Sequence, residues 1–402
     1  MISGNVRVIN VAYITHYAEL YGANRSLLDL MLQLRESGRV SPHLISASEG
    51  PAVSRAREMG IPVLVLPFSP WMTRRVFMGG PHHRLMQWWG YRRAAMQRAA
   101  KDRGLLPAAR RAVTGWKIDL VHANSSVIRF GHSIAAAMRL PLVWHVREFA
   151  FRHYHLYPDG GLAAFRRALR QADRVIAISD AVKQEMEHYM DGERIVRIYN
   201  GIIRDEEMRH PSQRPLPQEG ISRPFTFALI GYIHRSKGQL EALEAFAKLC
   251  AKGLDVRLVL AGSGNDASLK ELLAELDLGH RVELAGFVER PQDIYERADA
   301  LVVCSRHEAL GRVTIEAMAH RLPVIGHASG GTPELIAHGR TGYLYRTGVE
   351  LLRYMEELAT SPATARKMGI SAFDSLGDRF SVEARSMDVL RLYEEILAEG
   401  KE

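Results

Sequence analysis

The chain has 402 residues, of which 47% are hydrophobic and 24% are charged, and its net charge is +8. This length exceeds one ordinary domain, and the composition is that of a folded globular protein rather than a disordered or fibrous one. No run of about 18 apolar residues occurs, so a membrane-spanning helix is not expected. Two cysteines, Cys250 and Cys304, are too few for a disulfide framework or a thiolate metal site.

The beginning of the sequence has no basic segment followed by an apolar block and a small-residue cleavage site, so a secretory signal is not expected. Both cysteines lie in apolar stretches and are predicted to be buried and reduced. We therefore expect a cytoplasmic protein.

Short apolar runs alternate with amphipathic segments along the whole chain. The predicted strands are Val6–Ile14, Pro62–Leu66, Leu120–His122, Leu142–Val146, Val175–Ile178, Phe225–Ile230, Val256–Leu260, Val282–Leu284, Leu301–Val303 and Val324–Ile325. The predicted helices include Ser26–Arg35, Ser179–His188, Gln239–Ala251, Leu269–Leu276 and Ser381–Ala398. Continuous apolar strands alternating with helices are typical of right-handed βαβ units around parallel sheets. The expected fold is α/β, with two doubly wound Rossmann-like domains facing across a cleft.

A stretch rich in proline and polar residues, 209–220, divides the two halves and is predicted to be an exposed linker. We predict a first domain over 1–205, a linker over 206–224 and a second domain over 225–375. The helix within 376–402 is expected to pack back toward the first domain. Ligands of such sheets bind outside the carboxyl ends of the strands, where we expect the site.

The segment from Ser305 to Met318 follows a buried strand and opens a helix. It places Glu308 in the loop and Glu316 in the helix. Gly311 permits close approach of the backbone to a ligand, and the helix N-terminus offers N–H groups to anionic oxygens. A structural alternative has Glu308 capping the helix and Glu316 pairing with a surface cation, and the spacing alone leaves both open.

This segment, with 328–336 and 338–344 behind it, resembles glycosyltransferase family 4, a retaining family with the GT-B fold. Four further stretches resemble the same family in the same order: 21–24, 172–179, 199–202 and 231–238. The resemblance extends from about residue 8 to residue 344. It implies a hexosyl- or N-acetylhexosaminyl-transferase whose first domain binds the acceptor and whose second domain binds a UDP- or GDP-linked sugar.

The resemblance also implies three catalytic residues: His145, Lys237 and Glu308. Glu308 is expected near the transferred sugar, and His145 matches the family histidine beside that sugar. Lys237 matches the family lysine that meets the donor diphosphate, where a fixed cation stabilises the charge of the departing nucleotide. The alternatives are a solvated surface lysine for Lys237 and an ordinary hydrogen-bonded core histidine for His145.

Further donor-binding residues follow from the same resemblance. They are Gly22, Ala23, Arg235, Gly264, Phe287, Val288, Ala309, Leu310, Gly311 and Glu316. Glu316 is expected on the ribose hydroxyls, Phe287 and Val288 beside the base, and Gly22 with Ala23 in a loop before a helix. The chain departs from the family where Tyr232 replaces a common arginine, and Arg235 is the candidate that compensates for it.

No Asp-x-Asp triplet occurs, so the carboxylate pair of metal-dependent transferases is missing. We expect neither a metal nor any other cofactor, only the nucleotide-sugar co-substrate. Lys237 and helix N-termini are expected to neutralise the diphosphate instead.

Residues 71–117 carry eleven Lys and Arg against a single acid, Asp102. Aromatic residues interleave with these cations: Trp71, Phe77, Trp88, Trp89, Tyr91 and Trp116. Such a segment suits an anionic membrane surface, which would place the protein on the inner face of the cytoplasmic membrane beside a lipid-linked acceptor. The alternative is a solvated helical face with its aromatics packed inward. No nucleic-acid-binding motif accompanies the charge, so nucleic acid is not an expected partner.

The leading prediction is a retaining glycosyltransferase that moves a sugar from a nucleotide sugar to a hydroxyl of a glycan or lipid-linked acceptor, in assembly of a bacterial surface polysaccharide. Two alternatives remain open. One is a nucleotide-sugar epimerase on the same fold, and the other is a membrane- or nucleic-acid-binding protein on a catalytically inactive scaffold.

Overall fold

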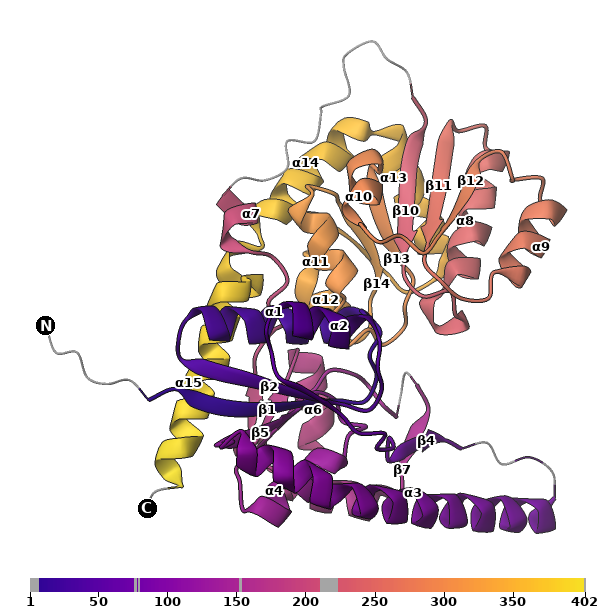
Figure 1. Ribbon diagram of the computed structural model, residues 1–402. Helices are drawn as coiled ribbons and strands as arrows, with labels where there is room; N and C mark the ends of the chain where they lie inside the picture. The colour runs from indigo at the N-terminus through magenta and orange to yellow at the C-terminus, as the bar shows by residue number, and fades with distance from the viewer. Residues whose placement is uncertain (1–6, 76–77, 79, 152–153, 210–222, 401–402) are drawn as a thin grey trace, which may run out of the picture. The chain divides into compact units, whose positions relative to one another are not determined.

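The computed structural model describes residues 7–75, 78, 80–151, 154–209 and 223–400. It divides into two compact units: unit 1 is Met1–Gly201 with Val382–Glu402, and unit 2 is Ile202–Ser381. Each unit has its own parallel sheet with helices packed against it (Figure 1), which confirms the predicted pair of doubly wound α/β domains. The expected linker begins in helix α7 (Asp205–Arg209), and its part over 210–222 lies outside the described residues.

Unit 1 is built on a seven-stranded parallel sheet with the order β3-β2-β1-β5-β6-β8-β9. Its strands are β1 (Ile9–Thr15), β2 (Val40–Ser46), β3 (Val63–Val65), β5 (Leu120–Ala123), β6 (Leu142–Val146), β8 (Arg174–Ala177) and β9 (Ile195–Arg197). The order runs outward in both directions from the β1–β5 pair, as in doubly wound sheets. A small antiparallel sheet pairs β4 (Met72–Arg74) with β7 (Leu156–Pro158).

The helices of unit 1 are α1 (Gly22–Glu36), α2 (Pro51–Glu58), α3 (Pro81–Gly115), α4 (Phe130–Met138), α5 (Gly161–Gln171), α6 (Asp180–Glu187) and α15 (Val382–Glu399). Helices α1 and α2 cover one face of the sheet, and α3 and α4 lie on the other (Figure 1). Helix α15 packs beside α1 and contributes Leu390 and Tyr393 to the same core as Val11 and Met31. The C-terminal segment is therefore part of the first core.

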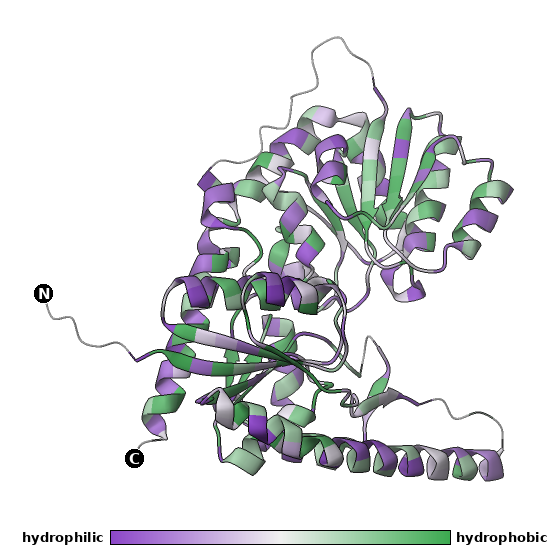
Figure 2. Ribbon diagram, viewed as in Figure 1, coloured by the Kyte–Doolittle hydropathy of each residue, from purple (hydrophilic) through white to green (hydrophobic). Residues whose placement is uncertain are grey.

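Unit 2 has a six-stranded parallel sheet with the order β12-β11-β10-β13-β14-β15. Its strands are β10 (Phe225–Ile230), β11 (Val256–Ala261), β12 (Val282–Gly286), β13 (Ala300–Val303), β14 (Val324–His327) and β15 (Gly342–Tyr345). Its remaining helices are α8 (Gln239–Ala251), α9 (Ala267–Glu275), α10 (Gln292–Arg297), α11 (Arg312–Ala319), α12 (Thr332–Leu335), α13 (Gly348–Thr360) and α14 (Pro362–Asp374). Phe227, Phe246 and Met355 are fully buried in its core, and the strands of both sheets are largely hydrophobic (Figure 2).

Strand β2 is absent from the sequence prediction because Pro42 and two polar residues interrupt its apolar pattern. It nevertheless pairs in parallel with β1, with Pro42 opposite Val11. The Leu44 N–H points toward β3, where it donates to the Pro62 carbonyl over 2.9 Å. Pro42, two residues earlier, faces the same side, but β3 begins only at Val63, so no strand there requires its missing N–H.

Helix α3 is 35 residues long, and its buried residues, Ala109 and Val113, both lie near its C-terminus. Its N-terminal turns extend beyond the strands of unit 1 (Figure 1), and hydrophilic and hydrophobic residues alternate along it (Figure 2). Trp89 is 59% exposed, whereas Trp71, which precedes the helix, is buried. The aromatics of the basic segment are therefore divided between the core and the surface. Among the helices of the part of the chain that the structure describes, none combines the length and the hydropathy that a membrane span requires.

Candidate functional site

Two predicted catalytic residues of unit 2 meet at the carboxyl edge of its sheet. Lys237 follows β10 and Glu308 follows β13, and these neighbouring strands are where the strand order reverses. Lys237 Nζ lies 2.7 Å from Glu308 Oε2, with the two side chains 22% and 19% exposed. The point of reversal in such a sheet is the usual ligand-binding crevice. Lys237 is thus neither isolated nor fully solvated, and the surface-lysine alternative is wrong.

The loop that carries Lys237 is held by backbone contacts that side chains would prevent. Gly238 has a φ of 70°, and a Cβ added there would lie 2.5 Å from the Cβ of Cys304. A Cβ at Gly262 would lie 1.9 Å from the carbonyl oxygen of Gly231. These approaches bring the loops after β10 and β11 together, and the Ile233 N–H donates to the Ser263 carbonyl over 2.7 Å. The predicted donor residue Gly264 belongs to this same contact.

The loop that carries Glu308 is fixed by the segment after β14. The Gly331 N–H donates to the Glu308 carbonyl over 2.7 Å, and the His307 N–H donates to Ser329 Oγ over 3.0 Å. Helix α11 begins after Gly311, which has a φ of 93° and provides no side-chain cap. Gly311, and not Glu308, therefore occupies the N-cap position of this helix. The carboxylate of Glu308 is held toward Lys237.

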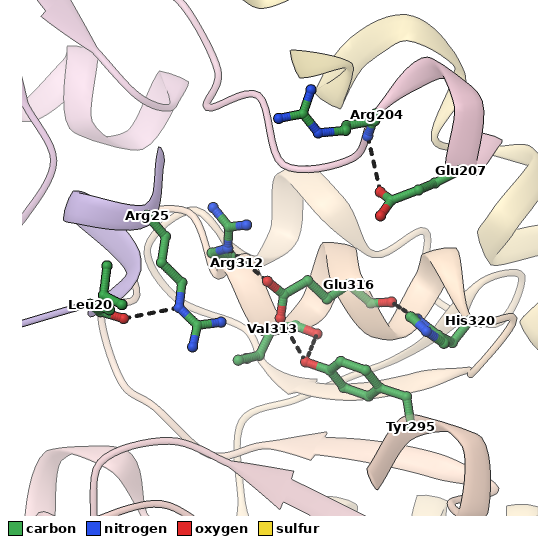
Figure 3. A network of polar contacts seen from close by, with 9 residues as sticks. All are labelled: Leu20, Arg25, Arg204, Glu207, Tyr295, Arg312, Val313, Glu316 and His320. Atoms are coloured by element: carbon green, nitrogen blue, oxygen red, sulfur yellow. Dashed lines mark hydrogen bonds and ion pairs between the residues drawn. The ribbon is translucent and has the colours of Figure 1, made fainter. Parts of the chain in front are cut away.

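Glu316 lies on α11 in a separate polar network, drawn in Figure 3. The buried Tyr295 hydroxyl donates to Glu316 Oε2 over 2.9 Å, and Arg312 Nε donates to Oε1 over 2.7 Å. The Glu316 side chain is 18% exposed and that of Arg312 is 19% exposed. The pairing with a cation foreseen by the structural alternative is therefore present, but it is largely buried rather than on the surface.

The other predicted donor residues of unit 2 follow the ends of the same strands. Arg235 is exposed two residues before Lys237, and Phe287, just after β12, is 64% exposed, with Val288 half-buried beside it. Ala309 and Leu310 are buried. Parallel pairing puts all these loops at one edge of the sheet. The structure thus gathers them at one edge, with direct contact between Lys237 and Glu308.

In unit 1, His145 lies at the carboxyl end of β6 and is 3% exposed. Its Nδ1 is 3.1 Å from His122 Nε2 and 3.2 Å from Arg147 Nη2. Its Nε2 is buried and has no hydrogen-bond partner among the described residues. Burial, then the nearby Arg147 and then His122, lower the pKa of His145 well below its ordinary value. His145 is therefore neutral at pH 7. Its Nδ1 contacts His122 and Arg147, and its Nε2 has no partner among the described residues.

Gly22 and Ala23 do not lie in a loop before a helix, as the sequence suggested. Helix α1 begins at Gly22, and Tyr21 is its N-cap residue. Asn24 explains this early start, because its side-chain N–H groups donate to the carbonyls of Tyr17 and Glu19, both over 2.9 Å. The preceding loop is thereby folded against the first turn of the helix.

Several residues of these networks were missed by sequence reasoning. Arg312 could have been found, because it stands four residues before Glu316 on a predicted helix. Tyr295 and His122 are distant in sequence from the residues that they contact, and no local pattern marks them. Within the described residues, no group of three His, Cys, Asp or Glu side chains could hold a metal ion. Metal independence stays a prediction.

Two family models match the chain in succession. The model of Glycosyltransferase Family 4 matches residues 20–206, and the model of glycosyl transferases group 1 matches residues 216–374. Together they cover every predicted site residue and all strands of both parallel sheets except β1.

Curated relatives include the N-acetyl-alpha-D-glucosaminyl L-malate synthase of Bacillus anthracis, 27% identical over 59% of this chain. The alpha-D-kanosaminyltransferase of Streptomyces kanamyceticus is 27% identical over 58% of this chain. In both comparisons the match spans 63% of the relative's length. A solved structure of Anabaena HepE, in complex with UDP and glucose, has a TM-score of 0.74 and 22% identity, covering 96% of this chain and 99% of that one. The chain therefore belongs to the glycosyltransferases of the family 4 type, with a group 1 domain and the GT-B fold.

Proposed function

We propose that the protein transfers a sugar, with retention of configuration, from a nucleotide sugar to a hydroxyl of a glycan or lipid-linked acceptor during assembly of a surface polysaccharide. The observation that carries this proposal is the Lys237–Glu308 ion pair where the strand order of the second sheet reverses. The UDP-glucose complex of the Anabaena neighbour supports a nucleotide sugar as the donor.

In this proposal Lys237 stabilises the leaving group. When the bond between the anomeric carbon and the phosphate oxygen breaks, negative charge grows on the diphosphate, and a positioned ammonium stabilises that charge most in the transition state. The acceptor oxygen bonds to the same face of the sugar, and its proton passes to the departing phosphate. Glu308 holds Lys237 in place before the donor binds and then lies beside the transferred sugar.

Glu316 is proposed to bind the ribose of the donor. Tyr295 and Arg312 each donate one hydrogen bond to its carboxylate, which fixes the position of the carboxylate. A carboxylate so held can still accept from ribose hydroxyls through its remaining lone pairs. Phe287 and Val288 are proposed to flank the base. We propose that this chemistry needs no metal, because Lys237 supplies the positive charge.

The first test compares Lys237→Ala and Glu308→Ala with the wild-type protein. Both variants are expected to lose transfer while their melting temperatures change by only a few degrees. Lys252→Ala is the matched control, because Lys252 and Glu356 form an ion pair on the exposed surface of the same unit. Full transfer by both site variants would refute the assignment. Consumption of donor without any acceptor would instead favour an epimerase-like enzyme.

A panel of UDP- and GDP-linked sugars identifies the donor by thermal stabilisation. A ligand present at one hundred times its dissociation constant adds about 2.7 kcal/mol to stability, which is readily measured. Absence of stabilisation by every nucleotide sugar would favour the catalytically inactive scaffold. Transfer that is unchanged by EDTA would support metal independence.

We also propose that the N-terminal part of α3 binds an anionic membrane. Leu85, Trp89, Arg92 and Met96 follow one another at three- and four-residue intervals and share one helical face. Leu85 is 55% exposed and Met96 is 63% exposed. Each cation near an anionic lipid surface contributes about 1 kcal/mol, and exposed apolar side chains can enter the interface. Such binding would bring the protein to the inner face of the cytoplasmic membrane and to a lipid-linked acceptor.

Sedimentation with vesicles tests the membrane proposal. The double variant Arg92→Glu/Arg93→Glu is expected to lose binding to anionic vesicles, while neutral vesicles bind neither protein. Arg110→Glu/Arg111→Glu makes the same charge change near the C-terminus of α3, where Ala109 and Val113 are buried against the rest of unit 1. This control variant is expected to reduce binding to anionic vesicles less. Equal binding by all three proteins would refute the proposal, and self-association in light scattering would assign the apolar face to a second copy of the chain.

A further inference from the structure

A buried chain of hydrogen bonds leads from His145 into the core of unit 1. His145 Nδ1 lies 3.1 Å from His122 Nε2, and His122 Nδ1 lies 2.6 Å from the Tyr393 hydroxyl. That hydroxyl lies 3.3 Å from the hydroxyl of Tyr13. Tyr393 belongs to α15, so the chain connects the C-terminal helix with the carboxyl end of β6. All of these side chains are buried.

The direction of donation in this chain follows from Arg147. Its guanidinium has donors and no acceptor, and Nη2 lies 3.2 Å from His145 Nδ1. His145 Nδ1 must therefore be the acceptor, and the proton of the neutral ring sits on Nε2. His122 Nε2 faces the same lone pair and must donate, so His122 Nδ1 accepts the proton of Tyr393. This arrangement satisfies the contacts of both imidazole rings, and it commits the single hydroxyl proton of Tyr393 to His122, at 2.6 Å, rather than to Tyr13, at 3.3 Å.

Both rings are neutral, as this arrangement requires. Burial, with a smaller effect of the nearby Arg147, lowers the pKa of both His122 and His145 well below the ordinary value. Arg147 is itself held by Asn124 Oδ1, over 2.6 Å, and by Asn200 Oδ1. The guanidinium is therefore held beside His145 Nδ1, where its 3.2 Å contact and the relay through His122 favour the same tautomer.

We propose that His122 and Tyr393 position His145 by fixing its ring as the tautomer that carries the proton on Nε2. His145 is then a hydrogen-bond donor and cannot be a base, because its acceptor nitrogen is already occupied. The ring borders a cavity of about 20 Å³, also lined by Arg147, Asn200 and Arg385. That space admits about one water-sized group, such as a hydroxyl of a bound sugar. The role toward sugar rests on the proposed function, whereas the tautomer does not.

The tautomer can be read without any substrate. In the full-length protein labelled with ¹⁵N-histidine, long-range proton–nitrogen spectra report which ring nitrogen carries the proton. The His145 signals are identified by their loss in His145→Gln. We expect the proton on Nε2 and a bare Nδ1. A proton found on Nδ1 of His145 in the wild-type protein would overturn the proposal.

Two matched variants test the relay. Tyr393→Phe removes the donor to His122 Nδ1, which frees His122 to take its other tautomer, so a proton is expected on Nδ1 in part of the His122 and His145 populations. Tyr13→Phe leaves the bond between Tyr393 and His122 in place and is expected to change neither ring. Spectra of Tyr393→Phe that match the wild-type spectra would refute the relay.

Rescue separates tautomer control from general packing. The amide of His122→Gln can donate to His145 Nδ1 and has no second tautomer, so it is expected to restore the Nε2 proton in the Tyr393→Phe background. Tyr393→Phe is expected to lose roughly tenfold in kcat for transfer, with little change in KM, and His122→Gln to recover most of it. A shifted tautomer with undiminished transfer would keep the relay and reject the place of His145 at the sugar.

Discussion

His132, on α4, offers a quantitative test of how unit 1 tolerates buried neutral imidazoles. Its Nε2 donates to the Ala168 carbonyl over 3.1 Å, and its ring packs edge-on against Trp144 with centroids 4.2 Å apart. Burial lowers its pKa from 6.5 to about 4; the Ala168 bond raises it less, and Arg129 lowers it slightly. Between about pH 6.5 and pH 4, His132 is therefore mostly neutral in the folded protein and mostly protonated in the unfolded chain.

The direction and size of the effect follow from this pKa. Above pH 6.5 His132 is neutral in both the folded and the unfolded state, so it does not make the free energy of unfolding depend on pH. As the pH falls from 6.5 toward 4, the unfolded state takes up the proton first and stability is lost. At pH 5.0 the loss from this one group is about 2 kcal/mol. His132→Phe and His132→Gln cannot titrate. Relative to the wild type, both variants should therefore gain about 2 kcal/mol between pH 7.5 and pH 5.0.

Urea unfolding followed by tryptophan fluorescence measures this difference. The five tryptophans, Trp71, Trp88, Trp89, Trp116 and Trp144, all lie in unit 1 and so report on its unfolding. The amide of His132→Gln can still donate to the Ala168 carbonyl, so the two variants are expected to differ at pH 7.5 by about 1 kcal/mol and to shift equally with pH. Stability curves of variants and wild type that stay parallel from pH 7.5 to pH 5.0 would refute the reasoning.

Three further outcomes are expected. Tyr295→Phe removes one hydrogen bond to the Glu316 carboxylate. In steady-state assays this variant should have a roughly tenfold higher KM for the nucleotide sugar with little change in kcat. An unchanged KM would contradict a ribose-binding role for Glu316. Gly330→Ala would put a Cβ 2.3 Å from the Glu308 carbonyl oxygen and should lower both the melting temperature and transfer. The control, Gly339→Ala, has a similar positive φ with open space around it and should cost only about 1 kcal/mol, so equal losses would argue against the contact. Burial raises the pKa of the Cys304 thiol to about 12, so mass spectrometry should find Cys304 alkylated at pH 8 only after unfolding, and rapid labelling of the native protein would refute its burial.

The alternation of apolar runs determined the fold class, because strands buried on both faces leave an unmistakable pattern in sequence. Strand β10 and helix α8 occupy the predicted residues, and the segment around Glu308 lies between a strand and a helix as expected. The loop positions of Lys237 and Glu308 follow from the same pattern, since each stands just after a buried strand. Their mutual contact over 2.7 Å was not predictable, because the two residues are 71 positions apart.

Only the tertiary structure decided how the candidate residues are held. The donors to Glu316 and the relay behind His145 come from segments far apart in the sequence, and local patterns carry no information about such contacts. Strand β2 escaped prediction because Pro42 interrupts its apolar pattern, and the sheet tolerates Pro42 because β3 begins only at Val63. Sequence fixes which side chains can be buried and which loops can bend, whereas hydrogen-bond partners depend on packing that brings distant segments within about 3 Å of each other.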